Sequence, residues 1–212
     1  MKVTRHSIII NLEGANTLGD LCIPDNAKGL VIFSHGSGSS RKSPRNQFVA
    51  EILNKNGYAT LLFDLLTPEE DEVYENRFNI ELLSGRLTHV AIWALNDDGL
   101  KHLPIGFFGA STGAASALFA CAVLQNKIKA VVSRGGRPDL ALQVLEKINT
   151  PVLLIVGAYD DEVIELNKSA YNKLGGVKEI KLIEGATHLF EEPGTLEKAA
   201  QSAVHWFKLH LK

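Results

Sequence analysis

Short apolar runs alternate along this chain with longer segments in which apolar residues recur every three or four positions. The short runs are typical of buried strands, and the periodic segments indicate helices with one apolar face. We predict strands at residues 5–12, 18–24, 29–33, 58–64, 103–108, 128–133, 151–156 and 178–183. We predict helices at residues 44–56, 80–96, 112–125, 140–148, 163–174 and 195–211.

The alternation of strands with helices predicts an α/β fold. Parallel strands joined by right-handed crossovers form one twisted sheet that helices cover on both faces. The first two strands instead form an antiparallel hairpin that turns at residues 14–16. We find no repeat, linker or low-complexity tract, so residues 1–212 are predicted to form a single domain. Little chain lies between the strands and helices, which argues against a large cap domain and predicts an open site.

Composition narrows the classes of partner. The chain has 212 residues, of which 45% are hydrophobic and 22% charged, and this balance fits one compact soluble domain. Its formal net charge of -2 gives no broad attraction to nucleic acid or to an anionic membrane. No apolar run approaches the roughly 20 residues of a membrane span. We therefore expect a small-molecule substrate, with no nucleic acid and no membrane, and a monomer or weak homodimer.

The cysteines and histidines form no pattern that would hold a metal. Cys22 and Cys121 lie in separate predicted elements without a C-x-x-C motif, and we expect two reduced thiols and a cytoplasmic location. There is no H-E-x-x-H motif and no histidine–cysteine cluster. We expect no metal and no organic cofactor.

One pentapeptide, G-A-S-T-G at residues 109–113, lies where a predicted strand meets a predicted helix. A G-x-S-x-G sequence at such a junction forms a sharp turn that exposes the serine hydroxyl above the sheet. The flanking glycines are needed because side chains there would collide where the strand and the helix cross. Ser111 is therefore the candidate nucleophile.

A serine hydroxyl is a poor nucleophile at its free pKa, so it needs a base, and the base needs a carboxylate to orient it. Two later loops supply both groups, in the order Ser, Asp, His. Asp160 follows the strand at 151–156, and His188 follows the strand at 178–183. Because parallel strands end at one edge of a sheet, the three side chains can converge there.

These two assignments have alternatives. Asp161 and Glu162 directly follow Asp160, and they are also suited to cap the next helix, where anionic side chains meet free N–H groups. His188 could instead be a structural histidine. Ordinary surface or packing roles are expected for the histidines in predicted helices and turns: His89, His102, His205 and His210.

The chemistry also needs donors aimed at the oxygen on which negative charge develops. The first candidate is the backbone N–H of Thr112, the residue after the nucleophile. The second is the N–H of Ser37 in the loop after the strand at 29–33, with Gly36 and Gly38 as near alternatives. His35 in the same loop is expected to organise the loop and not to act as a base.

Two other functions of this loop have weaker support in the sequence. A phosphate-binding loop would require G-x-x-x-x-G-K-[ST] or a complete G-x-G-x-x-G, and neither is present. The run from Ser39 to Lys42 matches S-x-x-K formally, but it lacks the motifs that accompany S-x-x-K in enzymes.

The segment at 67–75, T-P-E-E-D-E-V-Y-E, interrupts the alternation of elements. Such an acidic run, here from Glu69 to Glu75, is typical of a solvated, mobile loop. The alternative is a flap over the site, because the segment follows the carboxyl end of the strand at 58–64.

These motifs resemble the α/β-hydrolase superfamily, and more closely its dienelactone-hydrolase-like branch. The resemblance rests on His35-Gly36, on G-A-S-T-G around Ser111, on G-A-Y before Asp160 and on G-A-T-H-L-F around His188. It implies an α/β-hydrolase fold and hydrolase chemistry. True dienelactone hydrolases use a cysteine nucleophile, however, so lactone specificity is not carried over to a chain with a serine.

Two further runs, at 59–68 and 133–140, also resemble that branch, including members fused to phosphoribosyltransferase-like domains. No such domain lies within these residues. Arg134 and Arg137 follow the strand at 128–133, where a guanidinium could grip a substrate carboxylate through two hydrogen bonds. Alternatively, one or both pair with Asp139 or with the acidic segment.

The sequence thus predicts a serine hydrolase that cleaves a small carboxylic ester or thioester. Ser111 would attack the carbonyl carbon, His188 would take and return the proton, and Asp160 would orient the imidazole. Two other functions stay open: a binding protein that has kept the fold without turnover, and a peptidase or acyltransferase that shares the first acyl-enzyme step.

Overall fold

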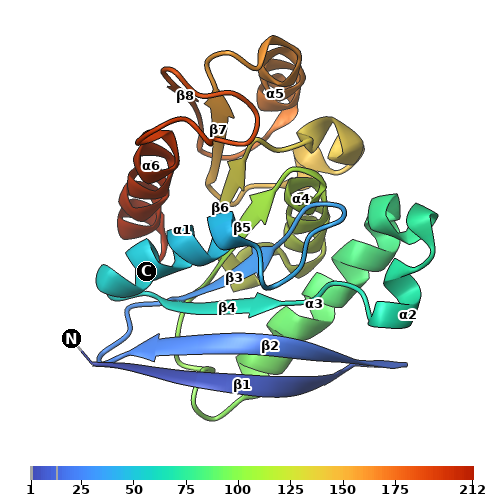
Figure 1. Ribbon diagram of the computed structural model, residues 1–212, viewed down its shortest axis with the longest axis vertical. Coiled ribbons are helices and arrows are strands. Elements are labelled where there is room, and N and C mark those ends of the chain that lie inside the picture. Colours follow the sequence, from blue (N-terminus) through green and yellow to red (C-terminus); the bar gives the residue numbers. More distant parts are fainter. Residues whose placement is uncertain (1, 13) are drawn as a thin grey trace.

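The computed structural model describes residues 2–12 and 14–212, and its strands form one eight-stranded sheet (Figure 1). The order across the sheet is β1-β2-β4-β3-β5-β6-β7-β8. The strands are β1 Val3–Leu12, β2 Ala15–Pro24, β3 Leu30–Ser34, β4 Ala59–Phe63, β5 Ile105–Ala110, β6 Ile128–Arg134, β7 Val152–Gly157 and β8 Lys178–Ile183.

The sheet is mostly parallel, as predicted. Only the pairs β1/β2 and β2/β4 are antiparallel, and the other five pairs run parallel. The N-terminal hairpin is confirmed, but β2 already begins at Ala15, so the hairpin is longer than the sequence indicated.

The strand order reverses between β3 and β5. After β3 the chain crosses to β4 on one side, and after β5 it crosses to β6 on the other. The two loops that leave these neighbouring strands therefore diverge and open a crevice at their carboxyl ends, where open α/β sheets bind ligands. Ser34 pairs with Gly109 at this edge, so the loop after Ser34 and the G-A-S-T-G turn lie side by side.

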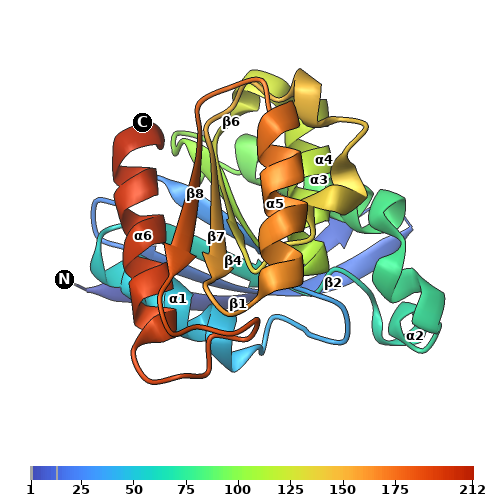
Figure 2. The same cartoon turned by 90° about the horizontal axis from the view of Figure 1, so that it is seen from above.

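Helices cover both faces of the sheet (Figure 2). One apolar cluster packs α1 (Pro44–Lys55) and α6 (Thr195–His210) against one face, and the other packs α3 (Ile80–Asn96) and α4 (Thr112–Leu124) against the opposite face. The fifth long helix, α5 (Asp161–Lys173), lies on the α4 side. Helices on both faces bury the central strands completely, which explains why β3, β4 and β5 consist mainly of apolar residues.

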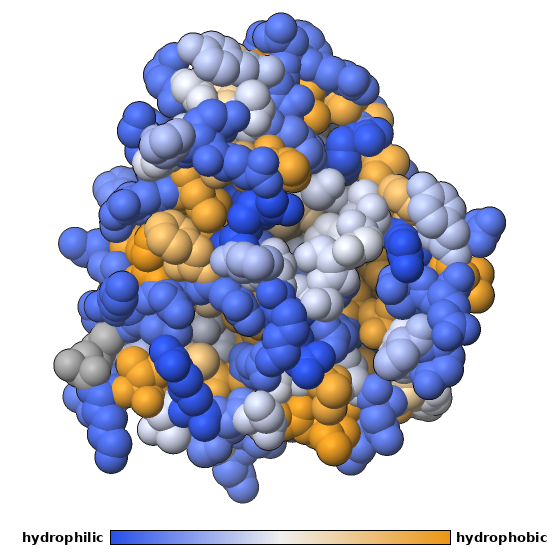
Figure 3. All heavy atoms as spheres, in the orientation of Figure 1, coloured by the Kyte–Doolittle hydropathy of each residue, from blue (hydrophilic) through white to orange (hydrophobic). Residues whose placement is uncertain are grey.

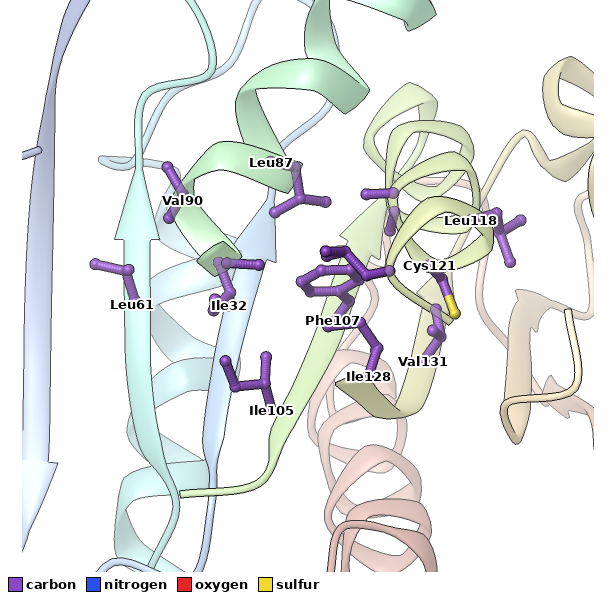
Figure 4. Close-up of a cluster of buried hydrophobic side chains, with 14 of the residues drawn as sticks. Ile32, Leu61, Leu87, Val90, Ile105, Phe107, Leu118, Cys121, Ile128 and Val131 are labelled. Atoms are coloured by element: carbon purple, nitrogen blue, oxygen red, sulfur yellow. The ribbon is translucent and has the colours of Figure 1, made fainter. Parts of the chain in front are cut away.

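The larger cluster is centred on side chains of the middle strands. Figure 4 shows Phe107 of β5 in one cluster with Leu87 of α3 and Leu118 of α4, and each of the three is fully buried. Cys121 lies in the same cluster, and burial raises the pKa of its thiol to about 11. Both cysteines are free, as predicted.

The prediction of a helix at 140–148 is wrong. The chain there forms two 3-10 turns, η3 (Pro138–Ala141) and η4 (Leu145–Lys147). A short segment gains little from helix propagation after the cost of nucleation, and 3-10 turns are common connectors. The two turns bury Ala141 and Leu145 beside α4.

The prediction of a mobile loop at 67–75 is also wrong. The segment forms α2 (Pro68–Asp71), followed by the 3-10 turn η1 (Tyr74–Phe78). Thr67 and Glu70 cap α2 reciprocally, and Pro68 takes the first helical position. Two of the segment's five acidic side chains are paired, Glu70 with Arg86 and Asp71 with Arg77, and the other three are exposed.

The face seen in Figure 3 is mostly hydrophilic, and its apolar residues are divided into separate small patches. Within the described residues, no helix combines the length and the apolar character that crossing a bilayer requires.

Candidate active site

Ser111 occupies a one-residue turn between β5 and α4. Its backbone has φ 53° and ψ −124°, a conformation that non-glycine residues adopt only under constraint from their surroundings. A Cβ on Gly109 would lie 2.5 Å from Ala114 Cα, and one on Gly113 would lie 2.2 Å from the carbonyl oxygen of Ser34. The crossing of strand and helix therefore excludes side chains on both sides of Ser111, as the sequence predicted.

Asp160 and His188 meet across two loops. His188 Nδ1 lies 2.7 Å from Asp160 Oδ2, and the carboxylate is the more buried partner, with 14% of its side chain exposed against 37% for the imidazole. Asp160 is also the N-cap residue of α5, but its side chain makes no capping hydrogen bond. The structure therefore brings Asp160 to the imidazole, while Asp161 and Glu162 lie in the first turn of α5.

The loop that carries His188 is fixed at two neighbouring points. Phe190 is 2% exposed and packs into the core beneath α1 and α6, in a backbone conformation with φ 57°. Thr187 donates to Glu192 through its amide at 3.2 Å and its hydroxyl at 2.6 Å. These hydrogen bonds lower the pKa of Glu192. The imidazole of His188 thus belongs to an ordered loop. The sequence analysis missed the two residues that fix this loop, Phe190 and Glu192.

Ser111 and His188 line one cavity of about 120 Å³ at the carboxyl edge of the sheet. Among the described residues, Ser111 Oγ makes no hydrogen bond to the imidazole. Catalytic hydrogen bonds are often long or poorly aligned in a free enzyme and tighten when substrate binds. The structure therefore brings the candidate nucleophile Ser111 and the candidate base His188 to one cavity, with Asp160 hydrogen-bonded to the far nitrogen of the imidazole.

The loop after β3 is organised by His35, as predicted. The buried imidazole accepts a hydrogen bond at Nε2 from the Leu65 amide at 3.0 Å, so the proton resides on Nδ1, which lies 3.0 Å from the carbonyl oxygen of Gly36. Burial lowers the pKa of His35 and favours this neutral form. With both ring nitrogens engaged, His35 is not available as a base.

The two predicted oxyanion donors differ in whether their N–H already has a hydrogen-bond acceptor. Thr112 is the first residue of α4, and a backbone N–H at that position has no acceptor within its own helix. The Ser37 N–H, in contrast, donates to Thr112 Oγ1 at 2.9 Å. Ser37 lies where the sequence predicted, but its donor is already engaged. No acceptor for the amides of Gly36 and Gly38 occurs within the described chain.

The two candidate arginines point to different environments. Arg137 forms two hydrogen bonds to Asp139, at 2.9 and 2.8 Å, which is the alternative that the sequence left open. It does not line the cavity that contains Ser111, so the geometry does not support Arg137 as a substrate ligand. Arg134 does line that cavity, and it is 7% exposed.

The S-x-x-K alternative fails on the position of its lysine. Lys42 Nζ lies 2.6 Å from Asp20 Oδ2 and is exposed, so it cannot activate a serine in the cavity.

Comparison with known families agrees with this geometry. The model of the dienelactone hydrolase family matches residues 19–211, which is most of the chain. The chain belongs to the dienelactone hydrolase family. A dienelactone hydrolase from Anabaena variabilis has a crystal structure with 46% sequence identity and a TM-score of 0.97, and the match covers 100% of both chains.

A protein of lower sequence identity shares the fold. Est1E from Butyrivibrio proteoclasticus matches with a TM-score of 0.81 at 20% identity, over 96% of this chain and 97% of its own. Among curated proteins, one from Mycobacterium tuberculosis that is named as a phosphoribosyl transferase is 53% identical over 193 residues. That match covers 91% of this dienelactone hydrolase family member but only 44% of the relative, so the chain spans less than half of that protein's length.

Two cavity residues of this family member were missed by the sequence analysis. Arg45 and Asn46 lie in the first turn of α1 and line the cavity with Ser111. Ser43 and Pro44 are a recognisable helix start, with Ser43 accepting from the Asn46 amide at 3.4 Å. Because α1 follows β3, its first turn lies at the same sheet edge as the nucleophile, and this placement could have been inferred.

Proposed function

We propose that this protein is a serine hydrolase that cleaves a small carboxylic ester or thioester through an acyl-enzyme on Ser111. The observation that carries the proposal is the 2.7 Å hydrogen bond between His188 Nδ1 and Asp160 Oδ2. It leaves Nε2 as the nitrogen that can take a proton, on a residue that lines the same cavity as Ser111. Membership of a hydrolase family supports the same chemistry.

In the first half-reaction, Ser111 Oγ attacks the carbonyl carbon while its proton passes to His188 Nε2. The carbonyl oxygen becomes an oxyanion, and the imidazolium is stabilised by Asp160. As the tetrahedral intermediate collapses, the bond to the leaving oxygen or sulfur breaks and His188 returns the proton to the leaving group. Water then attacks the acyl-enzyme by the same route and releases the acid.

The Thr112 amide is the first oxyanion donor in this proposal, because it lies directly after the nucleophile and at the positive end of α4. The loop from Gly36 to Gly38 supplies the second donor. The Ser37 N–H acts as this donor when the substrate oxygen replaces Thr112 Oγ1 as its acceptor. We propose that the protein works as a monomer or a weak homodimer on a small, diffusible substrate.

Labelling with a fluorophosphonate probe tests the nucleophile directly. We expect a single adduct on Ser111 in the folded protein, and no adduct in the Ser111→Ala variant or after denaturation. An unlabelled folded protein with no ester turnover would refute the proposal and favour a binding protein.

The acyl acceptor requires a second experiment. Hydrolysis rates of p-nitrophenyl esters with graded acyl chains should be compared with those of matched thioesters and anilides. Fast ester and thioester cleavage with a decline beyond short chains is the expected result. Preferred cleavage of the anilides, or transfer of the acyl group to an added alcohol or amine in place of water, would assign the triad to a peptidase or an acyltransferase.

A further inference from the structure

Arg134 is a buried guanidinium with few polar contacts. It is 7% exposed, and its Nη2 donates one long hydrogen bond, 3.4 Å, to Asn46 Oδ1. Nε and Nη1 are buried without a hydrogen-bond partner within residues 2–12 and 14–212. The ring of Phe190 lies on one side, with its centroid 5.6 Å from the guanidinium carbon. A side chain with five N–H donors is thus left mostly unsatisfied.

No carboxylate of the described chain forms an ion pair with Arg134. Buried charges in proteins are normally paired, because removing an ion from water costs more than packing returns. The neighbouring charge here is Arg45, which has the same sign, and burial together with Arg45 lowers the pKa of Arg134 to about 10. Arg134 therefore remains cationic at neutral pH. Arg45 itself donates to Glu191 at 2.9 Å, but that pair is solvent-exposed and weakly neutralising.

Both arginines line the cavity beside the nucleophile. Arg134 reaches it from the end of β6, and Arg45 reaches it from the first turn of α1, which lies beside the carboxyl ends of the central strands (Figure 1). One water requires roughly 10–15 Å³ by the same measure, so a cavity of about 120 Å³ has room for a small anionic group. The start of α1 adds the positive end of a helix dipole.

The backbone of Arg134 is hydrogen-bonded to the backbone of Ser111. Ala110 and Arg134 are partners in neighbouring parallel strands, and the Ser111 amide donates to the carbonyl oxygen of Arg134 at 3.3 Å. A shift of Arg134 would therefore shift Ser111. Their side chains enter one cavity from adjacent strand ends, so an anion held by the guanidinium would share that cavity with a carbonyl group attacked by Ser111.

We propose that Arg134 and Arg45 form an anion subsite that holds a carboxylate or phosphate group of the substrate cleaved at Ser111. This assignment rests on the proposed function only for the role of Ser111. The planar guanidinium suits both groups, because its parallel N–H bonds match two oxygens at once. The sequence analysis also proposed Arg137 as an anion ligand, but its guanidinium already donates two hydrogen bonds to Asp139.

A matched pair of substrates tests the subsite through turnover. p-Nitrophenyl hydrogen succinate carries an anionic acyl group, and p-nitrophenyl methyl succinate is its neutral counterpart. We expect Arg134→Gln to lower kcat/KM for the anionic ester by about 30-fold, the order of a charged hydrogen-bond pair, and to change the neutral ester by less than about threefold. Arg134→Lys should be intermediate, because lysine keeps the charge but loses the fork.

Binding measurements, which need no turnover, distinguish a carboxylate from a phosphate as the anion that the subsite holds. Inorganic phosphate and the carboxylate monomethyl succinate are titrated separately into the Ser111→Ala protein, and thermal unfolding and calorimetry are recorded. A ligand that binds the folded state raises Tm in proportion to its affinity. We expect one of the two anions to raise Tm, and the effect to be lost in Arg134→Gln and weakened in Arg45→Gln. Lys101→Gln, an exposed lysine paired with Asp98, is the charge-matched control.

The possible results separate the two proposals. Anion binding that depends on Arg134, without hydrolysis of any ester, would preserve the subsite and refute the hydrolase. The hydrolase would stand and the subsite would be refuted if the neutral ester is hydrolysed while the arginine variants change neither the preference for the anionic ester nor anion binding. Equal losses on both esters in Arg134→Gln, or anion binding unchanged in both arginine variants, would also refute the subsite. If Arg134→Gln does not fold, Arg134→Lys and Arg45→Gln still decide the question.

Discussion

The Ser37 amide donates to the side-chain hydroxyl of Thr112 at 2.9 Å, which links the loop after β3 to the first residue after the nucleophile. One residue thus has two roles at the site. The backbone N–H of Thr112 lies at the start of α4, where it is a candidate oxyanion donor, and its buried side chain accepts the hydrogen bond from the loop that contains the other candidate donors.

This link predicts distinct effects for two substitutions of Thr112. Thr112→Val keeps the shape but leaves the Ser37 N–H without its acceptor, so we expect the free energy of unfolding to fall by about 1–3 kcal/mol. Thr112→Ser keeps the hydroxyl and should stay within about 0.5 kcal/mol of the original protein. Urea denaturation of the two variants provides the measurement, and equal stability of both would show that the hydroxyl does not hold the loop.

The contact between His188 and Asp160 predicts which carboxylate serves the base. Asp160→Asn should lower kcat for a p-nitrophenyl ester by about 10²–10⁴, because the amide cannot stabilise the imidazolium in the same way. The matched control is Asp161→Asn, the adjacent carboxylate in the first turn of α5. We expect it to retain activity within about threefold, since a helix-terminal charge contributes only ~0.3–1 kcal/mol. A larger loss at Asp161 than at Asp160 would reverse the assignment.

The glycines predict opposite effects at two positions. A Cβ at Gly113 would lie 2.2 Å from the Ser34 carbonyl oxygen, so Gly113→Ala should destabilise the fold by about 2 kcal/mol or more. At Gly85 in α3 a Cβ meets nothing within 4 Å, and Gly85→Ala should stabilise by ~0.5–1 kcal/mol through helix propensity. Thermal unfolding measures both. An unchanged Tm for Gly113→Ala would mean that strand and helix can separate at this crossing.

His35 predicts a dependence of stability on pH. Burial lowers its pKa below the ordinary 6.5, so as the pH falls below about 6.5 the unfolded chain binds a proton that the folded protein does not. His35 therefore contributes stability above that pH and loses it progressively below. Replacing it should make the free energy of unfolding fall less steeply between pH 7.5 and 5.5, by up to ~1.4 kcal/mol for each unit of pKa shift.

Urea titrations of His35→Gln at the two pH values check this prediction. His205→Gln, which removes an exposed histidine of α6, is the matched control. If the slope of stability against pH is the same with and without His35, the imidazole titrates normally in the folded protein.

Elements with strong local patterns were predictable. The central strands are buried on both faces and therefore consist mainly of apolar residues, and the elbow at Ser111 needs glycines that no other residue can replace. The prediction failed where local pattern was weak or ambiguous. The charge of the segment at 67–75 indicates a loop, although T-P-E-E also contains a helix start. The segment at 140–148 is too short for its periodicity to distinguish a helix from 3-10 turns.

The sequence by itself determined the order of strands and helices and the three loops that reach one edge of the sheet, because those features depend on residues close together in the chain. Only the tertiary structure decided which groups pair across those loops. It placed Asp160 on His188, joined Ser37 to Thr112 and left two buried nitrogens of Arg134 with no hydrogen-bond partner in the described chain. Hydrogen bonds depend on tenths of an ångström between distant segments, and no local pattern of residues encodes such distances.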